Sequence, residues 1–171
     1  MNNNLSFDFS VNRENNTITV KREFEADINM VWDAYTKSEI LDLWWAPKPW
    51  KAKTKTMDFR DGGHWHYAMV GPEGEEHWAW AEYKNIQAQL PSGQRKFTGL
   101  DAFADAEGNI NQSLPQSEWQ ITFTPKGNLT IVECFITFSD LSQLETTLQM
   151  GFKDGMRIAM EGLDEIFASQ L

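Results

Sequence analysis

The central part of the chain alternates between apolar and polar residues with a period of two. The pattern runs from residue 51 to residue 138 through KTKTMDF, HWHYAMV, HWAWAEYKNI, RKFTGLDAF, SEWQITF and LTIVECFITF. Such alternation is typical of strands with one face in the core and the other toward solvent. Between the segments lie DGG, GPEGE, LPSGQ, DAEGN and PKGN, which favour hairpin turns. The pattern predicts an antiparallel meander whose apolar face another part of the chain must cover.

Helical segments on either side of the meander can supply that cover. Before it, Asp27 can cap one helix, and Ser38 can cap a second short helix that Pro47 and Pro49 end. After it, apolar residues return to helical spacing along one stripe: Leu141, Leu144, Leu148, Phe152, Met156, Ala159, Leu163 and Ile166. We predict an α+β fold with an antiparallel sheet of about six to seven strands. Two short helices follow the first strand, and a long C-terminal helix covers one face of the sheet.

The N-terminal residues form a polar lead to this plan. Leu5, Phe7, Phe9 and Val11 alternate with polar residues, NRENN at 12–16 can form a turn, and residues 17–24 alternate again. This predicts an opening hairpin, in which residues 1–16 can add an edge strand. No repeat or linker divides the remainder, so we assign residues 17–171 to one domain.

Composition excludes several partners. The formal net charge of −10 would repel nucleic acid and anionic membranes. The N-terminus lacks a signal-peptide pattern, and no run of about 18 apolar residues could cross a membrane. The only cysteine, Cys134, cannot form an intramolecular disulfide, which fits a reducing compartment. We therefore expect a soluble, cytoplasmic protein without membrane insertion.

One hairpin can be given a register from its turn. Residues 71–75, GPEGE, suit a type I turn followed by a glycine in the left-handed region, so that Gly71 faces Glu75. Counting back along both strands pairs Met69 with His77, Tyr67 with Ala79, and Trp65 with Ala81. These pairs set large residues against small ones, and we assign them to the concave face of the sheet.

The opposite face of the same hairpin carries His64, His66, Trp78, Trp80 and Glu82. We predict Trp78 and Trp80 as a partner surface, because aromatic residues anchor interfaces, and we expect it to form a homodimer. His64, His66 and Glu82 share this face, but nothing there encloses a metal ion, so we predict no metal site.

Aromatic residues make up 13% of the chain and can either fill a core or line a cavity. Asp101 shares its strand face with Phe97 and Phe103, and either enters this space or is turned outward, for example to cap a backbone amide. Gly151, Gly155 and Gly162 indicate either close packing of the last helix or room for a ligand. The residues that we predict to contact a ligand converge from three elements: Trp45, Trp65, Tyr67, Asp101, Phe103, Trp119, Phe152 and Met156.

The sequence gives weaker evidence for catalysis than for a ligand cavity. Cys134 lies in a strand without a recognisable partner, and no GxSxG motif occurs. Acid–base catalysis would require titratable groups in the cavity, for which Asp101 and Glu133 are candidates, although the alternation places Glu133 toward solvent. We assign no catalytic residue and no cofactor, and favour a protein that is not an enzyme.

Longer strings carry a family resemblance. REFEADINMVWDAYTKSEILDLWWAP at 22–47, MDFRDGGHWHYAMVGPEG at 57–74 and MGFKDGM at 150–156 occur in the order and spacing of stand-alone proteins related to the activator of the Hsp90 ATPase. The chain resembles this family, within the START-like (SRPBCC) superfamily, over nearly its whole length. The resemblance implies a helix-grip fold for residues 17–171, with a curved sheet around the last helix and often a cavity between them. Relatives bind lipids, hormones, polyketides or antibiotics, and some are cyclases.

The departures from the family bear on function. Only a short Asn-rich lead precedes the fold, where the eukaryotic activator has a further domain for chaperone contact, so chaperone stimulation is not expected. The first expectation is therefore binding or sequestration of a small apolar or aromatic molecule. A cyclase or isomerase in the same cavity is one alternative, and a protein-interaction or chaperone-related module with a filled cavity is another. An open volume would exclude the last, and a buried titratable group beside that volume would favour the enzyme.

Overall fold

An eight-stranded antiparallel sheet forms the frame of the molecule in the computed structural model, which describes residues 5–169. The strands are β1 (Phe7–Asn12), β2 (Thr17–Phe24), β3 (Lys51–Asp58), β4 (His64–Val70), β5 (Glu76–Gln87), β6 (Arg95–Ala104), β7 (Gln116–Lys126) and β8 (Leu129–Phe138). Their order across the sheet is β1-β2-β8-β7-β6-β5-β4-β3. The α+β prediction is confirmed. The sheet has more strands than the six to seven expected, and β1 lies where residues 1–16 were expected to add an edge strand; residues 1–4 lie outside the described part.

The register of the β4–β5 hairpin agrees with the one deduced from its turn. Met69 pairs with His77, Tyr67 with Ala79, and Trp65 with Ala81. The Gly71 N–H donates to the Glu75 carbonyl at 2.8 Å, and Gly74 takes φ +87°, which glycine adopts without a steric penalty. The turn thus aims alternate side chains of both strands at the concave face.

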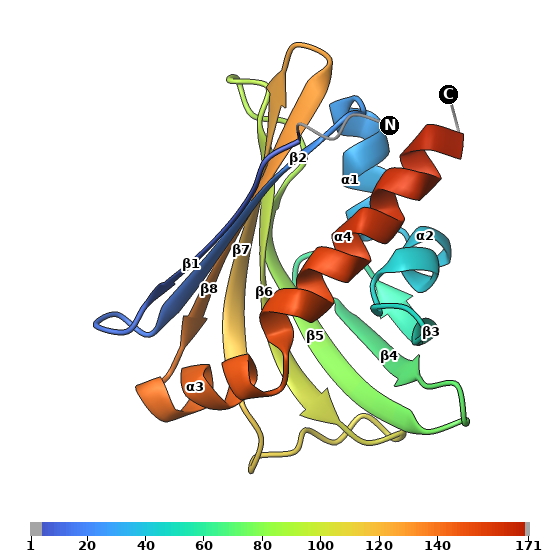
Figure 1. The fold of residues 1–171 in the computed structure, drawn as a ribbon, viewed down its shortest axis with the longest axis vertical. Coiled ribbons are helices and arrows are strands. Elements are labelled where there is room, and N and C mark those ends of the chain that lie inside the picture. Colours follow the sequence, from blue (N-terminus) through green and yellow to red (C-terminus); the bar gives the residue numbers. More distant parts are fainter. Residues whose placement is uncertain (1–4, 170–171) are drawn as a thin grey trace.

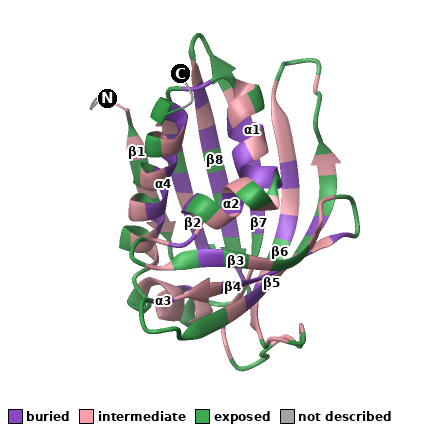
Figure 2. Cartoon of the chain, turned by 90° about the vertical axis from the view of Figure 1, so that its right-hand side faces the viewer, coloured by how far each residue is buried: buried purple, intermediate pink, exposed green. Residues whose placement is uncertain are grey.

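Four helices lie in the described part: α1 (Ile28–Thr36), α2 (Ser38–Trp44), α3 (Leu141–Gln149) and α4 (Phe152–Ser169). The curved sheet wraps α4, which crosses its concave face, while α1 lies near the C-terminal end of α4 and α2 lies beside β3 (Figure 1). Asp27 caps α1 as predicted, accepting from the Met30 N–H at 3.0 Å. Buried residues occur both on strands of the sheet and on the helices that cover it, so the core lies between these layers (Figure 2).

The C-terminal helical region is divided, and the prediction of one continuous helix was wrong in this detail. Gly151 ends α3 with φ +85°, and its N–H donates to the Leu148 carbonyl at 3.1 Å. A left-handed glycine of this kind commonly ends a helix. The break lets α3 lie along the end of the sheet while α4 turns back across the concave face (Figure 1).

A buried ion pair joins α4 to the sheet. Arg22 on β2 donates from a terminal guanidinium nitrogen (Nη2) to the Asp164 carboxylate on α4, and the two side chains are 7% and 17% exposed. The Arg22 guanidinium also lies 4.9 Å from the centre of the Phe24 ring. Burial raises the pKa of Asp164, while the charge of Arg22 and the hydrogen bond from it oppose that change. This charged contact fixes α4 on the apolar face of β2.

Candidate functional site

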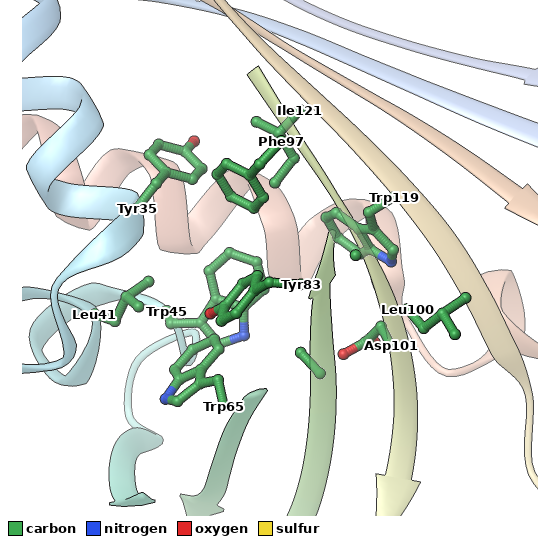
Figure 3. A pocket seen from close by; sticks show the side chains of 12 residues that line it. Tyr35, Leu41, Trp45, Trp65, Tyr83, Phe97, Leu100, Asp101, Trp119 and Ile121 are labelled. Atoms are coloured by element: carbon green, nitrogen blue, oxygen red, sulfur yellow. The ribbon is translucent and has the colours of Figure 1, made fainter. Parts of the chain in front are cut away.

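An open cavity of about 260 Å³ lies between α4 and the concave face of the sheet. Residues from the sheet, the α2–β3 connection, α3 and α4 line it: Trp45, Pro47, Tyr67, Met69, His77, Ala79, Asp101, Ala102, Phe103, Pro115, Ser117, Trp119, Ile136, Phe138, Thr147, Met150, Gly151, Phe152, Gly155 and Met156. A smaller cavity of about 50 Å³ adjoins it and extends toward α1. Trp45, Asp101 and Trp119 line both, and Figure 3 shows them among the residues that line the smaller cavity.

The walls are aromatic rings in edge-to-face and tilted contacts. The ring centre of Trp45 lies 5.6 Å from that of Trp65 and 5.9 Å from that of Trp119. Trp119 meets Phe152 of α4 at 5.9 Å and an interplanar angle of 87°. These contacts link the α2–β3 connection, the sheet and α4 around the cavity.

The indole N–H groups in this wall have partners within the protein. Trp45 donates to the Tyr67 hydroxyl at 3.0 Å, Trp65 to the Thr54 hydroxyl at 3.0 Å, and Trp119 to the Ser117 hydroxyl at 2.9 Å. The rings therefore offer mainly apolar surface to the cavity, since their polar atoms are already satisfied.

Asp101 faces the cavity, which decides between the two orientations left open by the sequence. It pairs with Ala81 of β5 on the concave side and lines both cavities (Figure 3). The side chain is half-buried. This burial raises the pKa of Asp101 to about 7. No donor among residues 5–169 makes a hydrogen bond to its carboxylate.

The same environment raises the pKa values of two tyrosines, Tyr67 and Tyr83. Burial raises the pKa of the Tyr67 hydroxyl well above its usual value, and the negative charge of Asp101 raises it further. Burial also raises the pKa of Tyr83, and the negative charge of Asp101 adds a smaller increase. Both hydroxyls stay protonated at neutral pH, so Asp101 is the carboxyl group in the wall whose charge can change near pH 7.

The structure brings together all eight residues predicted to contact a ligand. Seven line the larger cavity, and Trp65 lines the smaller one. Their contact with a ligand stays a prediction. Met69 and His77 were missed, although the predicted register already placed them on the concave face. Thr147 and Met150 were missed because the turn between α3 and α4 was not expected.

The glycines of the last helical region have different roles, and close packing is the wrong explanation for them. A Cβ atom at Gly155 would lie 3.6 Å from Pro47 Cγ, which is ordinary contact, and one at Gly162 would meet nothing within 4 Å. Gly151 supplies the left-handed break. Gly151 and Gly155 line the larger cavity, as the alternative explanation of room for a ligand requires.

The outer face of the hairpin is partly covered by the loop after β6. His66 is buried and its Nε2 lies 2.9 Å from the Asp105 carbonyl oxygen, while a Cβ at Gly108 would lie 3.1 Å from the Trp80 ring. Trp80 stacks on His64 with ring centres 4.5 Å apart. Trp78 and Trp80 are therefore half-buried, not free-standing, and their partner role stays a prediction.

The remaining candidates for chemistry lie away from the cavity. Cys134 is buried, and burial raises the pKa of its thiol to about 12, so the reactive thiolate is disfavoured. Glu133 faces solvent, as its alternation predicted. His64 Nε2 lies 2.8 Å from the Thr56 hydroxyl. Within residues 5–169, no group of three or more His, Cys, Asp or Glu side chains could hold a metal ion, and no helix is long and apolar enough to span a membrane.

A curved antiparallel sheet around a C-terminal helix, with an apolar cavity between them, defines a helix-grip protein. The profile of the family described as Activator of Hsp90 ATPase homolog 1-like protein matches residues 25–168, and the chain belongs to this family. A search of proteins with curated functions gave no significant match.

Solved structures of bacterial proteins share the fold over nearly the whole chain. A protein from Arthrobacter aurescens is 28% identical with a TM-score of 0.84, covering 95% of this chain and 91% of its own. Protein Ms6760 from Mycobacterium smegmatis is 29% identical with a TM-score of 0.82, covering 95% and 96%. A Staphylococcus epidermidis protein is 27% identical with a TM-score of 0.77, covering 95% of each chain.

Proposed function

We propose that the protein binds or sequesters a small apolar or aromatic molecule in the cavity between α4 and the sheet. The observation that carries this proposal is the open volume of about 260 Å³, walled by rings whose N–H groups are already bonded. An apolar cavity of ~150 Å³ can bind benzene, so this one has room for a larger aromatic molecule. The cavity is not filled by the protein's own side chains, which speaks against the interaction module.

Acid–base catalysis in the same cavity is the second candidate, and Asp101 is the observation that favours it. A carboxyl group with a pKa of about 7 can donate or accept a proton near neutrality. Cyclase-type chemistry needs a pair of such groups, and the tyrosines beside Asp101 have pKa values raised away from neutrality. We therefore favour binding over catalysis.

The buried Cys134 thiol is compatible with the cytoplasmic location expected from the sequence.

Filling the cavity tests the binding proposal. Naphthalen-1-ylmethanol, a neutral bicyclic probe, is expected to change the fluorescence of the wild-type protein, because Trp45 and Trp119 line the cavity. Gly155→Leu places a branched side chain in the cavity and should weaken binding at least tenfold. Titration of tryptophan fluorescence gives the dissociation constants.

Gly162→Leu is the matched control on the same helix. Gly162 does not line the cavity, and a Cβ there meets open space, so this variant should bind the probe within about twofold of wild type. Equal binding by wild type and Gly155→Leu, or no binding by wild type, would contradict the proposal.

We also propose that the outer sheet face forms a homodimer. Besides the half-buried Trp78 and Trp80, this face exposes Leu100 and Phe135, which are 44% and 42% accessible. Light scattering after gel filtration at micromolar concentration should give a dimer mass, and Trp78→Glu combined with Phe135→Glu should give a monomer. A wild-type monomer would refute this interface, and a dimer unchanged by both substitutions would place it elsewhere.

A further inference from the structure

The lining of the two cavities carries a negative group but no lysine or arginine. Asp101 is its only carboxylate, and no lysine or arginine contributes to either lining. His77 lies at the exposed end of the larger cavity, where its ring is 5.3 Å from that of Trp50. A ligand deep in the cavity therefore meets a negative group and no fixed positive one.

The carboxylate of Asp101 also lacks a protein partner. No donor in the described part of the chain makes a hydrogen bond to it, although buried charged groups in proteins are normally paired. A ligand that supplies a positive donor would satisfy this group.

The rings beside Asp101 suit the same kind of ligand. Trp45 and Trp119 line both cavities together with Asp101, and their N–H groups already donate to Tyr67 and Ser117. Where these rings line the cavity, their π surface can attract a cation. A carboxylate among tryptophans thus combines ion pairing with cation–π contact.

We propose that the ligand is an aromatic or apolar amine whose protonated nitrogen pairs with the Asp101 carboxylate while its apolar body packs against Trp45 and Trp119. This inference rests on the proposed binding function and adds the chemical class of the ligand. The formal net charge of −10 acts in the same direction, because a negative protein raises the local concentration of cations.

Two probes of equal shape test the charge requirement. Naphthalen-1-ylmethylamine is a cation at pH 8, and naphthalen-1-ylmethanol replaces its amine by a hydroxyl group. With the wild-type protein at pH 8, isothermal titration should show the amine binding at least tenfold more tightly than the alcohol. Asp101→Asn keeps the shape of the side chain and removes its charge. In this variant the amine should lose its advantage, while affinity for the alcohol stays within about threefold.

The pH dependence separates Asp101 from other groups. The affinity of wild type for the amine should rise between pH 6 and pH 8, because Asp101 loses its proton in this range. Tyr67 and Tyr83, which face Asp101 from β4 and β5, stay protonated throughout. The same titration with Asp101→Asn is the control, and a rise that survives in that variant does not come from Asp101.

The remaining outcomes of these titrations would contradict the inference. Equal affinity for both probes, or an amine preference that survives in Asp101→Asn, overturns the ion pair and leaves the binding function standing. Tighter binding of the alcohol would mean that a protonated Asp101 donates to an oxygen of the ligand. If neither probe binds wild type at millimolar concentration, the binding function fails and the amine inference fails with it.

Discussion

Replacing Arg22 by alanine is expected to lower the free energy of unfolding by about 3–5 kcal/mol, because it leaves the Asp164 carboxylate partly buried without its partner. The substitution also removes the packing of the guanidinium on the Phe24 ring. Urea unfolding followed by circular dichroism measures the loss.

A neighbouring residue provides the control. Lys21 precedes Arg22 on β2 but is exposed, so Lys21→Ala should change stability by less than about 0.5 kcal/mol. The double variant Arg22→Met with Asp164→Leu should recover most of the lost stability, since apolar side chains can replace a buried ion pair. A decrease of less than about 1 kcal/mol in the free energy of unfolding of Arg22→Ala would show that the ion pair does not stabilise the packing of α4 on the sheet.

Substituting Asp101 by asparagine is expected to stabilise the protein by about 2–4 kcal/mol at pH 8. The pKa of Asp101 rises from 3.8 to about 7 on folding. Well below pH 3.8 the group is protonated in both states, and the wild type carries no penalty. Between pH 3.8 and about pH 7 the unfolded chain ionises while the folded protein stays protonated, so wild-type stability falls relative to the variant and then levels off. Cavity water reduces the effect from its upper limit of about 4 kcal/mol.

The difference in stability between wild type and Asp101→Asn, measured from pH 4 to pH 8, isolates this group from the others. Asp105 offers a contrast, because the hydrogen bonds from Asn109 lower the pKa of its exposed carboxylate. Asp105→Asn should therefore destabilise at pH 8, the opposite direction. A stability difference for Asp101→Asn that stays constant across this pH range would show that Asp101 ionises normally in the folded protein.

Local patterns were enough to predict much of the frame. The turn at Gly71–Glu75 sets the register of its hairpin through short-range backbone geometry, and alternation then assigns the paired side chains at 64–70 and 76–82 to a face. That reasoning placed Trp65 and Tyr67 on the concave side. Asp27 similarly caps a helix through contacts within one turn.

Contacts between residues far apart in the chain could not be predicted from the sequence. Arg22 and Asp164 are separated by 142 positions, and neither lies in a motif that indicates the other. Whether Asp101 entered the cavity depended on the final position of α4 and the α2–β3 connection, which enclose it. The cover of His66 by the loop at Asp105 likewise forms only in the folded protein.

The place of α4 in the chain also affects how the protein is made. All eight strands are synthesised before α4, so the apolar concave face stays uncovered on the ribosome until residues 152–169 emerge. Uncovered apolar sheet surface is prone to aggregation in partly folded chains. Translation that stops before Met160, Leu163 and Phe167 would remove three of the buried residues with which α4 closes this surface. Such a product should accumulate as insoluble material, not as a smaller folded protein.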